Sequence, residues 1–318
     1  MRKKAGILIT LQLLISMGLM AQPPQIIVPK WKVGDSMIIQ EKGSIQMTLF
    51  GVKMPIESNT KYQLKVTSKD SEGYIIEAHN ISFIDLTGGG PMEELIKELA
   101  NNLQDVMKKA EQMKLVVRIS PQGEVKDLLN WQQVQTMLQE LGDGLLIGMG
   151  TKYNIPKEAL DSIRQKNFAK IDTKEKVMQQ TLEELEYLMS GYNVKYPLTG
   201  KLNVPSLIYS RMNYFELNHT GVPATLTTKT ISRKATDTQV SYDVVYNKQA
   251  LLDYINKTSE RKSLYTKDVL DKMIITEDRS FDFNLTTNWP KKIKMNSRMT
   301  IEKYIDIVIV SEYTITQY

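Results

Sequence analysis

The C-terminal stretch of the chain, residues 288–318, alternates in polarity with a period of two. Its apolar side chains fall on odd-numbered positions: Ile293, Met295, Met299, Ile301, Ile305, Ile307, Ile309, Tyr313 and Ile315. Successive side chains of a β-strand point to opposite faces, so this pattern predicts extended chain with one apolar side. Strands that alternate over their whole length are typical of an antiparallel sheet that is covered on one face.

A second alternating segment, residues 45–56, predicts a β-hairpin near the N-terminus. Its apolar residues stand at every second position before Phe50-Gly51 and again after it. Folding the chain about this dipeptide gives apolar pairs that share one face: Leu49 with Val52, Met47 with Met54, and Ile45 with Ile56. The alternation continues at Tyr62, Leu64 and Val66, and a third strand is expected over residues 74–83.

The middle of the chain changes to helical spacing. Apolar residues recur three or four positions apart in four segments, which predict helices: 92–110, 131–146, 156–168 and 173–189. The last of these is expected to begin with a capping box formed by Asp172 and Glu175 and to end at Gly191. Strands return from residue 196, with short helices near 249–255 and 267–273.

This order of elements predicts an α+β fold. We expect a large curved antiparallel sheet, an incomplete barrel, packed against the amphipathic helices, and the order leaves open two related halves. An N-terminal sheet with a helical segment would span residues 22–192. A C-terminal antiparallel sheet with short helices, continuous with the first part, would span residues 193–318.

The N-terminus has the layout of a secretory signal peptide. A basic start, Arg2-Lys3-Lys4, precedes an apolar run and the small residue Ala21. The apolar run is too short to span a bilayer and is interrupted by Gln12 and Ser16. We therefore expect a signal peptide over residues 1–21, cleavage near Ala21, and a periplasmic, secreted or cell-envelope protein with no transmembrane segment in the mature chain.

Charge and cysteine content exclude several classes of function. Loss of residues 1–21 would remove three of the 41 basic residues and none of the 36 acidic ones, leaving a net charge of +2. Phosphate binding requires a clustered cationic face, so no nucleic-acid partner is expected. The chain has no cysteine, which excludes disulfides, thiolate metal sites, a cysteine nucleophile and a lipidated cysteine.

The motifs that suggest chemistry are all weak. Residues 33–37 contain a Gly-Asp-Ser block, but no aspartate precedes a histidine at the spacing of that hydrolase class, and a turn leading into a strand explains the block better. His79 and His219, the two histidines, have no partners at metal-ligand spacing. No catalytic residues, no metal and no cofactor are expected, and the protein is interpreted as a non-enzyme.

Two further segments have structural explanations. The glycines of 142–150 follow a helix, so we interpret them as helix termination with a flexible hinge, because phosphate loops need a strand before the glycines. The acidic residues Glu183, Glu184 and Glu186 are expected on a solvated helix face, opposite the leucines of the same helix.

Three segments carry a resemblance to a known family: residues 48–74, 117–128 and 281–302, the last reading FDFNLTTNWPKKIKMNSRMTIE. With them the chain resembles a family of uncharacterised exported proteins of Gram-negative bacteria, which in turn is similar to the lipoprotein-carrier fold. The resemblance implies an incomplete antiparallel barrel wrapped over helices. Its motifs are turns and strands, so it implies no catalytic residues.

The one-faced strands lead to two hypotheses. In the first, the sheet leaves an apolar concave surface that binds a lipid, an acyl chain or an apolar protein segment, with methionines adapting to the ligand. The candidate ligand-binding residues are Ile45, Met47, Val52, Met54, Tyr62, Leu64, Ile293, Met295, Met299 and Ile301. In the alternative, the core is fully packed and the protein is a structural or assembly module that recognises an envelope protein partner.

Overall fold

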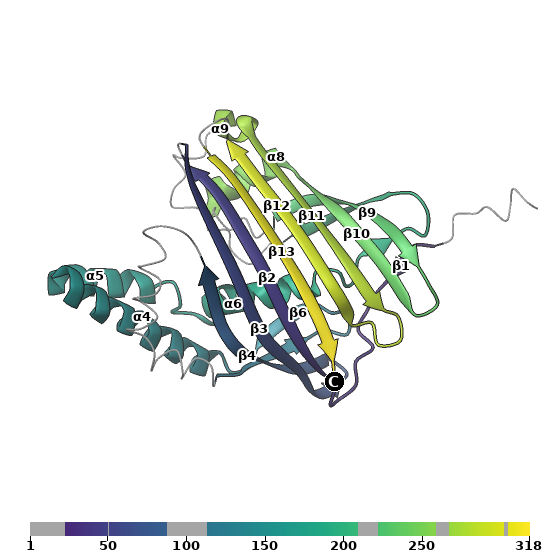
Figure 1. Ribbon diagram of the computed structural model, residues 1–318, viewed down its shortest axis with the longest axis horizontal. Coiled ribbons are helices and arrows are strands. Elements are labelled where there is room, and N and C mark those ends of the chain that lie inside the picture. The colour runs from purple at the N-terminus through teal and green to yellow at the C-terminus, as the bar shows by residue number, and fades with distance from the viewer. Residues whose placement is uncertain (1–22, 50, 88–112, 209–221, 259–266, 302–304) are drawn as a thin grey trace, which may run out of the picture.

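The structure, a computed structural model, describes residues 23–49, 51–87, 113–208, 222–258, 267–301 and 305–318. The expected signal peptide, the expected helix over 92–110 and His219 lie outside these residues. Half of the described chain belongs to one eleven-stranded antiparallel sheet (Figure 1). From edge to edge, its strands are β6 (Val125–Leu128), β5 (Leu115–Ile119), β4 (Gly73–Thr87), β3 (Val52–Asp70), β2 (Ser36–Leu49), β13 (Ile305–Gln317), β12 (Pro290–Ile301), β11 (Met273–Asn284), β10 (Asp237–Tyr246), β9 (Val222–Arg233) and β8 (Leu202–Ile208).

The sheet is open, with β6 and β8 as its two edges. Strands that follow one another in the sequence pair within two runs, β2 to β6 and β8 to β13. The two runs join where the C-terminal strand β13 pairs with β2. A separate two-stranded sheet is formed by β1 (Gln25–Ile26) and β7 (Lys195–Tyr196). The predicted large antiparallel sheet is therefore confirmed, and its first and last strands in the sequence, β2 and β13, lie side by side at its centre.

The predicted hairpin has the register that its apolar pattern required. Leu49 pairs with Val52, Met47 with Met54 and Ile45 with Ile56. The alternation of the C-terminal segment is also confirmed, because the odd-numbered residues of β12 from Ile293 to Met299 are buried while their even-numbered neighbours are exposed. The apolar side chains that alternate along these strands therefore form the inner face of the sheet.

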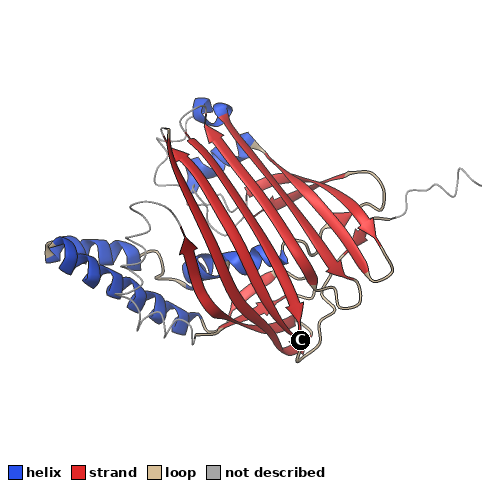
Figure 2. Cartoon of the chain, viewed as in Figure 1, coloured by secondary structure: helices blue, strands red, loops and turns tan. Residues whose placement is uncertain are grey.

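The helices cover this inner face (Figure 2). Two short helices, α6 (Lys174–Thr181) and α7 (Glu183–Met189), lie behind the sheet in this view, while α4 (Trp131–Tyr153) and α5 (Lys157–Phe168) extend beyond its edge. Two further helices, α8 (Lys248–Thr258) and α9 (Lys267–Lys272), lie at one end of the strands. Among the described helices, none is long and apolar enough to cross a membrane.

The helix expected over 173–189 is two helices instead of one. The break falls at Leu182, which caps α6 and begins α7 with its side chain fully buried. The predicted capping box is also wrong by one residue, because Thr173 caps α6 by accepting a hydrogen bond from the backbone N–H of Lys176. Asp172, one residue before the cap, pairs instead with the Lys176 ammonium group, 2.7 Å away.

The glycines of 142–150 do not end a helix, so the expected hinge is wrong. Helix α4 continues through them to Tyr153 and ends at Asn154, whose φ of 49° is left-handed. The glycines let α5 approach closely: a Cβ atom at Gly150 would lie 2.5 Å from the Leu160 side chain. Arg164 of α5 also bonds Asp143 of α4 at 2.6 Å, so the segment is a helix–helix contact.

The Gly-Asp-Ser block at residues 34–36 is a turn that leads into β2, as expected. The backbone N–H of Asp35 donates to the carbonyl of Lys32 at 3.0 Å, and the Asp35 carboxylate accepts from the N–H of Lys32 at 2.9 Å. The same carboxylate accepts from Nε1 of Trp289 at 3.3 Å. The block therefore fixes the start of the strand.

Candidate functional site

The candidate ligand-binding residues divide between two buried clusters. Tyr62, Leu64, Ile293 and Met295 belong to the larger cluster, which α6, α7 and residues 27–31 help to form, and none of these four is more than 7% exposed. Met299 belongs to a second, smaller cluster, and Ile45, Met47 and Ile301 pack against it half-buried. Val52 and Met54 of β3 pair with Leu49 and Met47 of β2, as above, but the structure does not describe their side chains.

The second cluster lies at the end of the sheet that α8 and α9 cover (Figure 1). Its buried members come from one helix and three strands: Leu251, Met273, Met299, Ile307 and Ile309. Half-buried apolar side chains of α8 and α9, Leu252 and Val269, pack against it. Helices α8 and α9 therefore contribute side chains to this cluster.

A cavity of about 480 Å³ opens beside the second cluster. The ladder between β10 and β11 ends at the pair Val244 and Glu277, and the residues that would continue it all line the cavity: Val245, Tyr246, Ile275 and Thr276. Leu251 of α8 and Met273 complete its apolar wall. The cavity, which we name the first cavity, is therefore a separation of two neighbouring strands beneath α8.

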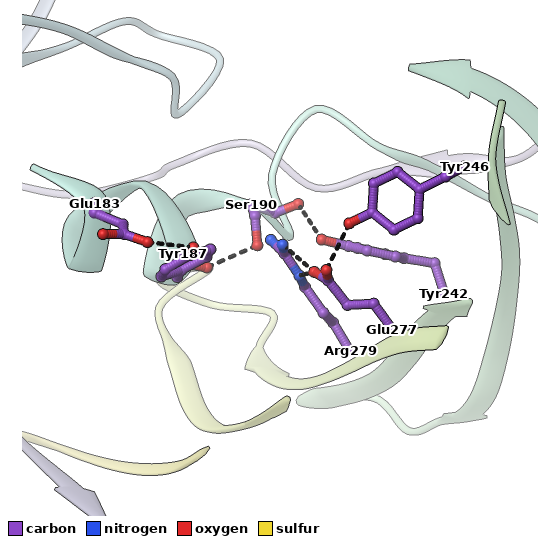
Figure 3. A network of polar contacts seen from close by, with 7 residues as sticks. All are labelled: Glu183, Tyr187, Ser190, Tyr242, Tyr246, Glu277 and Arg279. Atoms are coloured by element: carbon purple, nitrogen blue, oxygen red, sulfur yellow. Dashed lines mark hydrogen bonds and ion pairs between the residues drawn. The ribbon is translucent and has the colours of Figure 1, made fainter. Parts of the chain in front are cut away.

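Glu277 and Tyr246, which line the first cavity, belong to a buried ionic network (Figure 3). Arg279 and Glu277 are two residues apart on β11, so both point to the inner face, and Nε of Arg279 donates to the Glu277 carboxylate at 2.7 Å. Tyr246 donates to the other carboxylate oxygen, also at 2.7 Å. Burial disfavours the charge of Arg279, but the Glu277 carboxylate favours it, and the pKa of the guanidinium lies above its usual range.

Tyrosines enclose the guanidinium group. The carbon at the centre of the Arg279 guanidinium lies 5.1 Å from the centre of the Tyr187 ring and 5.9 Å from that of Tyr242. Tyr242 donates to the carbonyl of Ser190 at 3.3 Å, and Tyr187 donates to Glu183 at 2.7 Å. The network thus joins β10 and β11 to helix α7 (Figure 3).

A second cavity, of about 380 Å³, lies on the other side of this network. Arg279, Tyr242, Ser190 and Glu186 line it, together with the turn at residues 123–126. Burial, together with the nearby Glu183, raises the pKa of Glu186 to about 8. The second cavity is therefore more polar than the first, and it is lined by Arg279, whereas the first is lined by the partner of Arg279, Glu277.

The expectation that Glu183, Glu184 and Glu186 lie on a solvated helix face is wrong. All three are half-buried, Glu183 accepts from Tyr187, and Glu184 accepts from the hydroxyl of Tyr313. The break at Leu182 gives α7 a direction of its own and brings these carboxyl groups under the sheet. The sequence did carry a signal for the network, because Glu277 and Arg279 occupy odd positions in the apolar alternation of β11.

The raised pKa of Glu186 predicts that the protein loses stability as the pH rises. Its folded-state pKa of about 8 exceeds its ordinary value of 4.5, so the folded chain holds the proton more tightly than the unfolded chain. The contribution is complete at low pH and is lost as the pH rises to about 8. We expect Glu186→Gln to remove about 1–2 kcal/mol of pH-dependent stability, a value reduced for partial solvent screening. Urea unfolding of both proteins between pH 5 and pH 9 measures the difference, and parallel curves would contradict the assignment.

Of the two histidines, the structure describes His79. His79 lies on β4 opposite Gln63 of β3. Within the described ranges, no three histidine or acidic side chains are grouped so that they could hold a metal ion.

Comparisons with known proteins give no family. No family model and no curated protein matches the chain. A lipovitellin structure concerned with lipid–protein interactions is 9% identical with a TM-score of 0.46, over 90% of this chain but only 25% of the lipovitellin chain. An outer membrane channel from Pseudomonas putida F1 is 8% identical with a TM-score of 0.20, over 91% of this chain and 98% of the channel. Similarity at this level assigns neither a family nor an activity.

Proposed function

We propose that this protein is a non-enzymatic, exported protein of the cell envelope that binds one apolar chain, such as a lipid acyl chain, in the first cavity. The observation that carries the proposal is the separation of β10 from β11 beneath α8, which leaves a cavity of about 480 Å³ with an apolar wall. Cavities of roughly 300–1,000 Å³ with mostly apolar walls are typical of small-molecule sites.

The proposal places the ligand at the end of the sheet that holds the second cluster. Tyr62, Leu64, Ile293 and Met295 are fully packed beneath the helices, so a ligand there would have to displace the core. Beside the second cluster, Ile45, Met47 and Ile301 are only half-buried. Methionine side chains adapt readily to apolar partners of different shape, which suits Met47, Met273 and Met299 to this role.

The first test fills the first cavity with a larger side chain, which should prevent an apolar ligand from binding there. We expect Ile275→Trp to weaken binding of a neutral fluorescent alkyl probe by about tenfold or more, which corresponds to at least ~1.4 kcal/mol. Ile275 lines the first cavity, whereas its neighbour Ile274 is 62% exposed on the other face of the sheet. Ile274→Trp is therefore the matched control and should bind the probe as wild type does. Equal binding by both variants would contradict the proposal.

The packed larger cluster favours the alternative, a structural or assembly module with no small ligand. Four of the candidate ligand-binding residues are core residues, as a module with a filled interior requires. Native mass spectrometry of protein purified from its host, together with crosslinking in cells, separates the two functions. A co-purifying lipid supports the first, whereas a ligand-free protein with one crosslinked partner supports the second.

Export is supported by the sequence, through Arg2-Lys3-Lys4, the apolar run and Ala21. The intact mass of the protein purified from its host should correspond to a chain that begins at Gln22. A mass that includes residues 1–21 would contradict export with cleavage. The binding rather than catalytic role is likewise supported by the sequence, in which neither histidine has partners at a catalytic or metal-ligand spacing.

A further inference from the structure

The charged side chains that border the first cavity are mainly acidic. Asp243, Glu277 and Asp278 line it, while Lys248 is the cation among the lining residues. The Lys248 ammonium group donates to the carbonyl of Asp271 at 3.2 Å, so it is directed toward the end of α9. The guanidinium that balances Glu277 belongs to Arg279, which lines the second cavity instead.

Two of these carboxylates stand directly opposite one another. Asp243 of β10 pairs with Asp278 of β11, next to the last pair of the ladder. Like charges at directly opposed positions destabilise a sheet, so this pair has an energetic cost in the protein alone. Asp278 receives one hydrogen bond, from Nδ2 of Asn296 at 2.9 Å. A cation placed between Asp243 and Asp278 would offset their repulsion.

The polar groups at the inner end of the first cavity are already paired. The buried Glu277 carboxylate accepts from Arg279 and from the Tyr246 hydroxyl. The charges that would select a ligand are therefore those of Asp243 and Asp278, which favour a ligand that brings its own donors and repel a carboxylate or phosphate.

We propose that the ligand of the first cavity is a single-chain amphiphile whose polar end is an amine. Its ammonium group lies between Asp243 and Asp278, and its alkyl chain lies against Leu251, Met273 and Ile275. This inference rests on the proposed function, because it specifies the class of ligand for the same cavity.

The test compares ligands that differ only in their polar end. An alkylamine, the alcohol and the fatty acid of equal chain length are used to displace the neutral alkyl probe at pH 7 and low salt, below their micelle concentrations. We expect the amine to bind about tenfold more tightly than the fatty acid, with the alcohol between them. The difference should shrink at high salt, since the carboxylates are near the surface.

Paired variants identify the carboxylates responsible. The double variant Asp243→Asn with Asp278→Asn removes the repulsion in the protein and should fold, and it should bind the amine and the fatty acid about equally. Asp282→Asn changes an aspartate on the same face of β11 that does not line the cavity, and it should keep the preference of wild type.

The outcomes separate this inference from the proposed function. A fatty acid that binds wild type as tightly as the amine overturns the inference and leaves the proposed function standing. An amine preference that survives in the double variant also overturns it, because the carboxylates would not be its cause. If the probe and all three ligands fail to bind wild type, both proposals fall.

Discussion

Replacing Arg279 with alanine is expected to lower the free energy of unfolding by about 3–5 kcal/mol. Arg279 is buried, and its partner Glu277 would keep a buried carboxylate with only the Tyr246 hydroxyl, among these contacts, to stabilise it. Removing one partner of a buried ion pair costs more than removing both, because the remaining charge is uncompensated. Guanidinium chloride unfolding of the variant measures the loss.

Two further variants control this prediction. The double variant Glu277→Gln with Arg279→Met removes both charges and should recover most of the loss. Arg298→Ala breaks an ion pair with Asp306 whose side chains are 58% and 40% exposed, and it should cost less than about 1 kcal/mol. If Arg279→Ala costs no more than Arg298→Ala, the network does not stabilise the fold.

Replacing Trp31 with alanine is expected to cost about 3–5 kcal/mol as well. The fully buried Trp31 ring stacks on Trp289, with ring centres 4.0 Å apart and planes 12° apart. The rings of Tyr74 and Tyr192 contact its other sides, with centres 5.0 and 5.7 Å away. These contacts join the N-terminal segment to β4, to the turn before β12 and to the turn after α7, so a cavity at Trp31 would affect several elements together.

Trp131 provides the matched control for this loss. It is the first residue of α4 and is only partly buried against the same cluster, so Trp131→Ala should cost roughly 1 kcal/mol. Far-UV circular dichroism in increasing denaturant measures both variants without depending on tryptophan fluorescence. A loss for Trp31→Ala that does not exceed the loss for Trp131→Ala would contradict the role given to the aromatic cluster.

The strands were predictable because their signal is local. A period of two identifies the apolar face of β12 and β13 directly, and the symmetry of apolar residues about Phe50-Gly51 fixes the register of β2 and β3. Turn residues added a boundary at the Gly-Asp-Ser block, where the backbone N–H of Asp35 donates to the Lys32 carbonyl at 3.0 Å. Each of these features depends on neighbours in the sequence.

The site was not predictable because it depends on contacts between distant segments. The pairing of β13 with β2 joins residues more than two hundred positions apart, and periodicity does not specify it. The first cavity arises where the ladder of β10 and β11 ends at Val244 and Glu277, although both strands continue. The glutamates of α7 were wrongly predicted to face solvent, because the helix breaks at Leu182. Only tertiary packing determines where α7 lies after that break.

Photoaffinity labelling tests the central claim most directly. A long-chain alkylamine with a diazirine at its apolar end is bound to the intact protein, irradiated and located by peptide mass spectrometry. The account predicts labels on residues 243–251 and 273–278, where the first cavity lies, and loss of those labels in Ile275→Trp but not in Ile274→Trp. Labels that fall instead around Tyr62 and Ile293, or that are unchanged in Ile275→Trp, would contradict it.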